Sequence, residues 1–258
     1  MSLPDLAALA EALRPIMRRA GEATLEIYRT DFEVFRKEDA SPVTAADAAA
    51  EEIILSALGA LTPDIPVVAE EQAAIGNIPE IDQAPFWLVD PLDGTKEFIN
   101  RRDEFTVNIG LIADRRPVLG LVYCPVLDQL YVGHGAGTAT REVAGVREDI
   151  RVRRPDGDGL IVLSSRSHAN SEALAAFLQG QPVKQVIDAG SSLKFCRLAE
   201  GQADIYPRFG PTCEWDTAAA HAVLEAAGGS VTLTDGGAFL YGKPGFLNPH
   251  FIARGAAA

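Results

Sequence analysis

Three acidic side chains follow two of the short apolar runs that the sequence predicts as strands. Glu70 comes directly after one run and Asp90 after the next, and Asp93 follows three residues later in the segment DPLDGT. Strand ends meet at the rim of a sheet, where sites in α/β proteins are usually built. Carboxylate oxygens suit hard cations, so Asp90 and Asp93 can converge on one Mg²⁺, with the Leu92 carbonyl as a further ligand. The spacing therefore indicates a cation site.

A segment that favours anions comes next. Gly94 and Thr95 precede residues 96–99, which the sequence predicts as the first turn of a helix. The free N–H groups of such a turn attract an anion, and a glycine lets a phosphate approach the backbone closely. A carboxylate-lined cation site beside an amide-lined anion site is the layout of metal-assisted phosphoryl hydrolysis. Taken alone, DPLDGT is explained equally well by a surface turn that caps a helix.

Four further candidates lie at predicted helix starts. Asp216 opens a helix over 215–227, Asp47 lies early in a helix that ends at Leu61, and Ser191 and Lys194 belong to the first turn of a helix over 191–200. Helix capping or the helix dipole explains Asp216 and Asp47 in isolation, whereas Ser191 and Lys194 make the start of their helix a second plausible anion site.

The elements that must position these residues fall into two parts. Apolar spacing predicts a helix over 4–29, which Pro15 is expected to kink or divide, and a second helix that Thr44 caps. Strands are predicted over 67–69, 86–89, 106–112, 118–123 and 129–132. Strands over 160–164, 183–187 and 203–206 then alternate with helices over 171–178, 191–200 and 215–227. We therefore expect an N-terminal α+β domain, 1–135, that carries most of the acids, and a C-terminal α/β domain, 136–258, that contributes Asp216. The junction falls within 133–159, whose alternating arginines and acids predict a solvated loop or edge strand.

Composition narrows the function classes. The 258 residues are 47% hydrophobic and 23% charged, the balance of a globular protein, and 23 − 36 gives a net charge of −13. That charge argues against nucleic-acid polymers and anionic membranes as partners. Three scattered cysteines are too few for a disulfide framework, so we expect them reduced and buried. No apolar run approaches the roughly 18 residues of a membrane helix, so we expect a cytoplasmic protein. Peripheral association with the inner membrane stays open, although the charge does not favour it.

Together the motifs carry a resemblance that none carries alone. Glu70-Glu71, DPLDGT at 90–95 and WDTAA at 215–219 resemble the three signature motifs of the inositol monophosphatase superfamily, whose members are metal-dependent, lithium-sensitive phosphatases. SPVTAAD at 41–47, KEFI at 96–99, EFTVN at 104–108, SRSH at 165–168 and the stretch 190–211 resemble its CysQ branch. CysQ proteins are 3'(2'),5'-bisphosphate nucleotidases of sulfur metabolism. The likeness runs from the first helix to the closing FLNP.

The resemblance implies an αβαβα layered sandwich, part α+β and part α/β, with the site between its halves. It implies that two or three Mg²⁺ ions are bound by four carboxylates and one carbonyl, those of Glu70, Asp90, Asp93, Asp216 and Leu92. It also implies that Gly94 and Thr95 hold the phosphate, and that Asp47, Thr95 and Glu70 are catalytic residues around the attacking water.

The expected reaction is hydrolysis of adenosine 3',5'-bisphosphate to AMP and phosphate by metal-activated water, with the 3'-phosphoadenylyl sulfate analogue as a further substrate. Ser191 and Lys194 are candidates for the second phosphate or the nucleotide. Inositol mono- or bisphosphate hydrolysis at the same metal site is one alternative, and a non-catalytic metal-dependent nucleotide binder is another. The sequence leaves open whether two copies form a homodimer.

Overall fold

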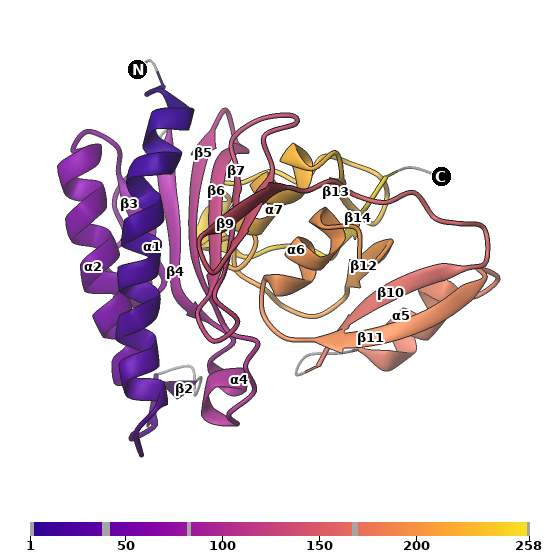
Figure 1. The fold of residues 1–258 in the computed structure, drawn as a ribbon, viewed down its shortest axis with the longest axis horizontal. Helices are drawn as coiled ribbons and strands as arrows, with labels where there is room; N and C mark the ends of the chain where they lie inside the picture. Colours follow the sequence, from indigo (N-terminus) through magenta and orange to yellow (C-terminus); the bar gives the residue numbers. More distant parts are fainter. Residues whose placement is uncertain (1–2, 38–41, 82–83, 167–169, 257–258) are drawn as a thin grey trace.

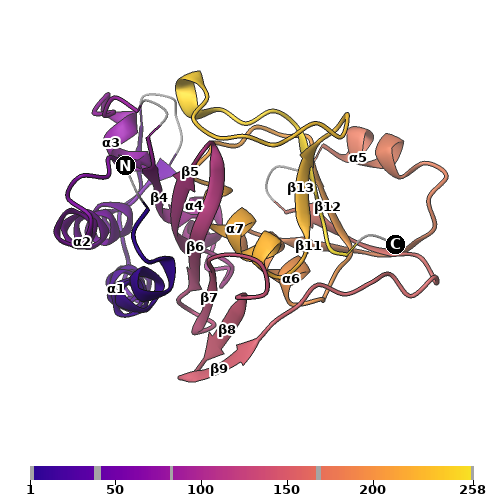
Figure 2. The same cartoon turned by 90° about the horizontal axis from the view of Figure 1, so that it is seen from above.

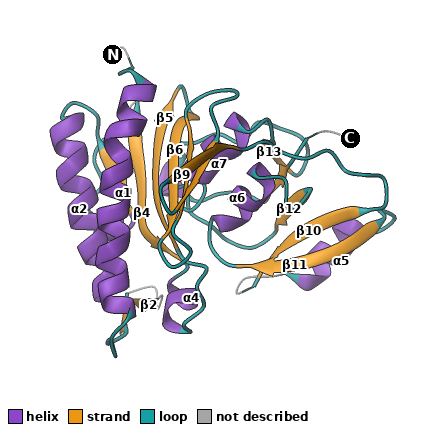
Figure 3. Ribbon diagram, in the orientation of Figure 1, coloured by secondary structure: helices purple, strands orange, loops and turns teal. Residues whose placement is uncertain are grey.

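The computed structural model describes residues 3–37, 42–81, 84–166 and 170–256. Its elements form five layers (Figures 1 and 2): helices α1 and α2, a seven-stranded sheet, helices α6 and α7, a five-stranded sheet, and helix α5 on the outside. Figure 3 shows the same layers by type of element. This is the αβαβα sandwich that the resemblance implies.

The outer helices cover the first sheet. Helix α1, Leu6–Tyr28, begins where the Asp5 carboxylate accepts hydrogen bonds from the next turn, and α2, Ala45–Leu61, begins at a capping box formed by Thr44 and Asp47. Of the two outcomes expected for Pro15, a kink or a division, the division of the first helix is wrong, since α1 runs through it. A proline costs one backbone hydrogen bond, and the buried apolar face of α1 against α2 and the sheet holds the helix together.

The seven-stranded sheet has the order β3-β4-β5-β6-β7-β8-β9, and all its neighbouring pairs are antiparallel except β3 with β4. Its strands are β3 Val67–Ala69, β4 Phe86–Asp93, β5 Thr106–Ala113, β6 Arg116–Cys124, β7 Gln129–Gly133, β8 Thr140–Val143 and β9 Val146–Asp149. The exposed edge strand β9 confirms the prediction for that charged segment. Strand β3 ends at Ala69 as predicted, and Glu70–Ala74 forms the short helix α3. Strand β4 differs from the prediction, because it continues past Asp90 to Asp93 through a register shift.

The five-stranded sheet has the order β11-β10-β12-β14-β13, and the sequence predicted only its first three strands. Its strands are β10 Leu160–Ser165, β11 Val183–Ala189, β12 Ile205–Arg208, β13 Ser230–Leu233 and β14 Phe251–Arg254. The accompanying helices are α5 Ser171–Leu178, α6 Leu193–Ala199 and α7 Ala218–Ala226, and a 3₁₀ turn spans Pro244–Phe246. A hairpin of β1 Phe35–Arg36 and β2 Pro42–Val43 and a short helix α4, Thr95–Ile99, complete the described elements. The first sheet ends at Asp149 and the second begins at Leu160, and the division at residues 135 and 136 stays a prediction.

A row of glycines lets the second half pack closely onto the first sheet. Gly110, Gly120 and Gly133 are register partners across β5, β6 and β7. A Cβ atom at Gly120 would lie 2.0 Å from the Ala219 carbonyl oxygen, so α7 rests directly on this row. Because Asp216 lies just before α7, the close packing brings this acid of the second half to strand β4, which carries Asp90 and Asp93.

The remaining reactive side chains are structural. Cys124 and Cys196 are buried free thiols, whereas Cys213 is half-buried, so the expectation of burial is wrong for one of the three. His221 is buried in α7, with its Nδ1 atom 3.0 Å from the Tyr241 hydroxyl, and therefore belongs to the core. Within the described ranges, no helix is both long and apolar enough to span a membrane.

Candidate functional site

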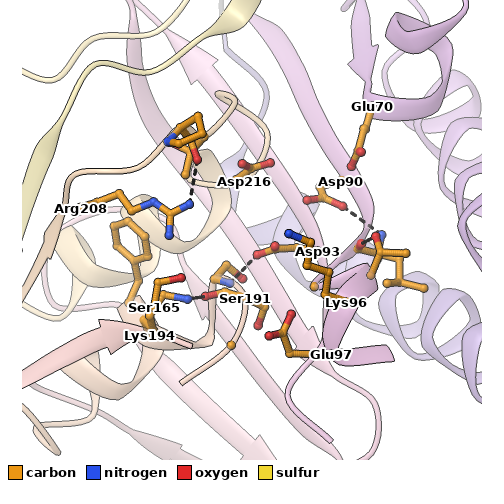
Figure 4. Close-up of a pocket in the computed structure, with 18 of the residues that line it drawn as sticks. Glu70, Asp90, Asp93, Lys96, Glu97, Ser165, Ser191, Lys194, Arg208 and Asp216 are labelled. Atoms are coloured by element: carbon orange, nitrogen blue, oxygen red, sulfur yellow. Dashed lines mark hydrogen bonds between the residues drawn. The ribbon is translucent and has the colours of Figure 1, made fainter. Parts of the chain in front are cut away.

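A cleft of about 550 Å³ opens between the two halves of the molecule. From the first half it is lined by Glu70, Asp90, Leu92, Asp93, Gly94 and Thr95, and from the second half by Ser165, Ser191, Lys194, Tyr206, Arg208 and Asp216, among others. Figure 4 shows four carboxylates turned toward one another on one side of the cleft and two cationic side chains on the other. We call these the acidic wall (Glu70, Asp90, Asp93 and Asp216) and the cationic wall (Lys194 and Arg208).

Backbone geometry positions the acidic wall. The register shift in β4 lets Asp90 and Asp93 both face the cleft, and the Asp90 Oδ1 atom accepts a hydrogen bond of 3.0 Å from the Leu92 amide. Asp93 accepts a hydrogen bond from the Ser192 amide, and Asp216 accepts one of 2.8 Å from the Cys213 amide. Among the residues that the structure describes, the Asp90 Oδ2 atom is buried without a hydrogen-bond partner. A buried carboxylate oxygen left in this way favours a cationic ligand.

The pKa shifts of the acidic wall also favour a cationic ligand. Burial raises the pKa of Asp90 well above its usual value, and the charges of Glu70, Asp93 and Asp216 raise it further. Burial and the charge of Asp93 likewise raise the pKa of Asp216. Burial raises the pKa of Asp93 to about 6, although Lys194 opposes that shift. The cluster thus lacks positive charge, which a divalent cation would supply.

The donor set fits a hard cation such as Mg²⁺, since it consists of carboxylate and carbonyl oxygens. As the side chains stand, no three histidine, cysteine or acidic groups in the described part of the chain are arranged to hold an ion. One reason is visible at Glu70, whose carboxylate pairs with Lys37 at 2.7 Å, and Lys37 also pairs with Glu71 at 2.6 Å. We therefore expect Glu70 to turn away from Lys37 when a cation is bound.

The predicted catalytic pair is only partly brought together. Thr95 lines the cleft, with its hydroxyl 3.5 Å from the Leu92 carbonyl oxygen, whereas Asp47 is absent from the described lining. Asp47 is buried behind it, where its Oδ2 atom accepts hydrogen bonds from the Thr44 amide and hydroxyl at 2.8 and 2.9 Å. Burial raises the pKa of Asp47 to about 6, Thr44 opposes that shift, and the charge of Glu70 adds to it. The joint action of Asp47 and Thr95 on a water molecule stays a prediction.

Gly94 is required at the start of α4 for two reasons. Its φ angle of 93° lies in the left-handed region, which side chains other than glycine rarely adopt. A Cβ atom there would also lie 3.3 Å from the Ser191 Cβ atom, which is tighter than most such contacts. The glycine keeps the floor of the cleft open beside the acidic wall.

The cationic wall is held by backbone carbonyls. Lys194 is buried, and its ammonium group donates to the carbonyl groups of Ala189 and Ser191 and lies 5.2 Å from the centre of the Tyr206 ring. Burial lowers the pKa of Lys194 to about 8, although the charge of Asp93 opposes that shift. Arg208 is also buried and donates to the Pro211 carbonyl at 2.7 Å.

Sequence reasoning missed Arg208. The strand-end rule that identified Asp90 applies to Arg208 as well, because Arg208 is the last residue of β12. The sequence predicted that strand to end at residue 206, two positions early. Ser167 and His168, part of a motif that the sequence analysis singled out, lie outside the described residues.

A layered sandwich with an acid-lined cleft between its halves is the architecture of one family of phosphatases. Residues 5–257 match the sequence profile of the inositol monophosphatase family, and the chain belongs to that family.

Two curated relatives are similar over nearly the whole chain. The chain is 49% identical over 246 residues to the 3'(2'),5'-bisphosphate nucleotidase CysQ of Salmonella typhimurium, which covers 94% of this chain and 98% of that protein. It is 49% identical over 239 residues to the protein of the same name from Escherichia coli strain K12, and the match covers 92% of this chain and 95% of that protein.

Solved structures confirm the fold. CysQ from Bacteroides thetaiotaomicron, a bacterial member of the inositol monophosphatase family, superposes with a TM-score of 0.81 at 36% identity, covering 97% of this chain and 98% of that one. An inositol monophosphatase from Anabaena gives a TM-score of 0.79 at 25% identity, covering 98% and 92%. The family and the fold class expected from the sequence are thus confirmed.

Proposed function

We propose that this chain is a 3'(2'),5'-bisphosphate nucleotidase that hydrolyses adenosine 3',5'-bisphosphate to AMP and phosphate. The 49% identity to CysQ nucleotidases over 94% of the chain carries this proposal. The two walls of the cleft support it, because one suits a metal-assisted reaction at a phosphate and the other offers cations for a second phosphate. By the same chemistry, 3'-phosphoadenylyl sulfate would give adenylyl sulfate.

The acidic wall would hold two or three Mg²⁺ ions through the side chains of Glu70, Asp90, Asp93 and Asp216 and the Leu92 carbonyl. When bound, Mg²⁺ stabilises negative charge on phosphoryl oxygens and lowers the pKa of water toward neutrality. The chain's own groups do the rest. The backbone amides of Gly94 and Thr95 hold the phosphate that leaves, and the Thr95 hydroxyl, Asp47 and Glu70 orient the attacking water.

The cationic wall would give the substrate preference. Lys194 and Arg208 lie across the cleft from the acidic wall, and Ser191 lies between Lys194 and Asp93 (Figure 4). Charge-assisted hydrogen bonds from these groups to a second phosphate would favour a bisphosphate over a monoester.

The test is phosphate release from adenosine 3',5'-bisphosphate and from inositol 1-phosphate, measured side by side with Mg²⁺, with EDTA, and with Mg²⁺ plus Li⁺. We expect preference for the nucleotide, activity that disappears in EDTA, and inhibition by Li⁺. Preference for inositol 1-phosphate would keep the acidic wall and overturn the nucleotide assignment. No release from either ester, with retained Mg²⁺-dependent nucleotide binding, would instead identify a non-catalytic binder.

A further inference from the structure

A closed ring of three buried polar side chains joins the two halves of the molecule beneath the acidic wall. Thr106 and Asn108 belong to β5, and Ser192 lies just before α6. The Ser192 hydroxyl donates to Asn108 Oδ1 at 2.7 Å, Asn108 Nδ2 donates to Thr106 Oγ1 at 3.2 Å, and the two hydroxyl oxygens are 2.8 Å apart. Because the Ser192 hydrogen is given to Asn108, Thr106 must donate to Ser192, so the ring runs in one direction. We call these three residues the polar ring.

The polar ring leads directly to the acidic wall. The backbone amide of Ser192 donates to Asp93 Oδ2. Two residues earlier, the Gly190 amide donates to the Glu104 carboxylate at 2.9 Å. Groups of the first half thus hold the turn on both sides of Ser191, whose φ angle of 46° lies in the strained left-handed region.

The polar side-chain groups of the ring are paired with one another, although Ser192 itself lines the cleft. Ser192, Asn108 and Thr106 are 2%, 1% and 0% exposed, and their side chains bond to one another. A buried hydrogen bond adds only about 1 kcal/mol net, and apolar side chains of the same shape give similar stability. A fully satisfied ring is therefore better explained by the definite position that it imposes on its members.

We propose that Thr106, Asn108 and Ser192 are positioning residues that fix the Ser192 amide and thereby hold the Asp93 carboxylate ready for a cation. The proposal rests on the proposed function, since it takes Asp93 as an Mg²⁺ ligand. Groups that orient metal ligands typically contribute ten- to hundredfold to metal affinity.

The experiment measures Mg²⁺ binding to the full chain by titration calorimetry, with the melting temperature of each metal-free variant as a check on folding. Thr106→Val keeps the shape and removes the hydroxyl, and Ser192→Ala breaks the ring at its other side. We expect each to bind Mg²⁺ at least tenfold more weakly than the wild type. The double variant should bind no more weakly than the weaker single variant, because one break already opens the ring.

Two further variants separate positioning from general destabilisation. Thr62→Val is the matched control, because the Thr62 hydroxyl is also buried, accepts from Trp87 Nε1 at 2.9 Å and donates to the Leu58 carbonyl. We expect it to lower the melting temperature and leave Mg²⁺ affinity unchanged. Thr106→Ser keeps the hydroxyl and should retain wild-type affinity, and excess Mg²⁺ should restore turnover in Thr106→Val.

Asp93→Asn, measured in parallel, separates this proposal from the proposed function. If Asp93→Asn binds Mg²⁺ weakly while Thr106→Val and Ser192→Ala bind within twofold of the wild type, the polar ring does not position the ligand. An equal loss of affinity in Thr62→Val would overturn the proposal too. If Asp93→Asn itself binds like the wild type, Asp93 is not a ligand, and the metal site of the proposed function is wrong.

Discussion

The two walls of the cleft carry buried charges of opposite sign, and the structure accommodates them in different ways. The donors of the cationic wall are paired within the fold, because Lys194 and Arg208 donate to backbone carbonyls, although burial still lowers the pKa of Lys194 to about 8. The acidic wall lacks such partners, because the charges of its other members raise the pKa of Asp90, whose Oδ2 atom has no hydrogen-bond partner among the described residues. The fold thus gives the cationic wall hydrogen-bond partners, while the acidic wall is built for a ligand and destabilises the fold without it. Mutations that neutralise each wall should therefore act in different ways.

The largest effect is expected for Asp90→Asn. The substitution removes one candidate ligand, and we expect kcat/KM to fall roughly a thousandfold, as when a strong electrostatic contribution is removed from a transition state. The metal-free variant should nevertheless melt at a higher temperature than the wild type, because a buried charge repelled by three others is gone. Steady-state phosphate release and a melt in EDTA measure the two effects.

Asp235→Asn is the control for Asp90→Asn, since it makes the same change of charge at an exposed turn. It should leave both quantities unchanged. Turnover within tenfold of the wild type, or a metal-free Asp90→Asn protein less stable than the wild type, would contradict this account of the acidic wall.

A smaller effect is expected for Lys194→Met on the cationic wall. A charge-assisted hydrogen bond contributes about 1.5–3 kcal/mol, so KM for adenosine 3',5'-bisphosphate should rise about 10- to 100-fold while kcat changes less. Lys184→Met is the control, because Lys184 is exposed and pairs only with surface acids such as Asp156. A drop in kcat at unchanged KM would show that Lys194 acts on Asp93 rather than on the substrate.

The two walls also differ in how far the sequence could predict them. Asp90 and Asp93 follow an apolar strand within one short motif, so residue type and spacing identified them. Arg208 was not identified, because the sequence predicted that its strand ends two residues earlier. The polar ring joins Ser192 to Asn108 across 84 positions, so only the tertiary fold brings its members together.

The elements of the fold differ in the same way: some follow from local sequence patterns, and others depend on tertiary contacts. The long helices and strands β3 to β7 of the first sheet were predicted from apolar patterns, whereas β8 and β9 lie in the segment predicted as a solvated loop or edge strand. Strands β13 and β14 were missed, since each has four residues and pairs with partners far along the chain. Pro15 misled the local reasoning, because the packing of α1 outweighs the lost hydrogen bond.

The smallest expected effect is the pH dependence of the stability of the metal-free protein. It tests the difference between the two walls in the absence of substrate. Asp93 has a pKa of about 6 in the folded protein, against about 4 in an unfolded chain, and those of Asp90 and Asp216 are raised as well. The folded state then binds more protons than the unfolded state, so metal-free stability falls as pH rises through the folded pKa values. We expect the melting temperature in EDTA to be roughly 5 °C lower at pH 7.5 than at pH 5.5.

Mg²⁺ should reverse this trend, since protons compete with the cation for the same oxygens, and the Mg²⁺-induced gain in melting temperature should be larger at pH 7.5. Asp90→Asn should reduce the fall of the metal-free melting temperature with pH, because it removes one carboxyl group whose pKa is raised. Lys194→Met should extend the trend to higher pH, because Lys194 holds down the pKa of Asp93. A metal-free melting temperature that rises from pH 5.5 to 7.5 would mean that the ionised carboxylates of the acidic wall do not destabilise the fold. The proposed difference between the cationic wall, which has hydrogen-bond partners within the fold, and the acidic wall, which requires a cation, would then be wrong.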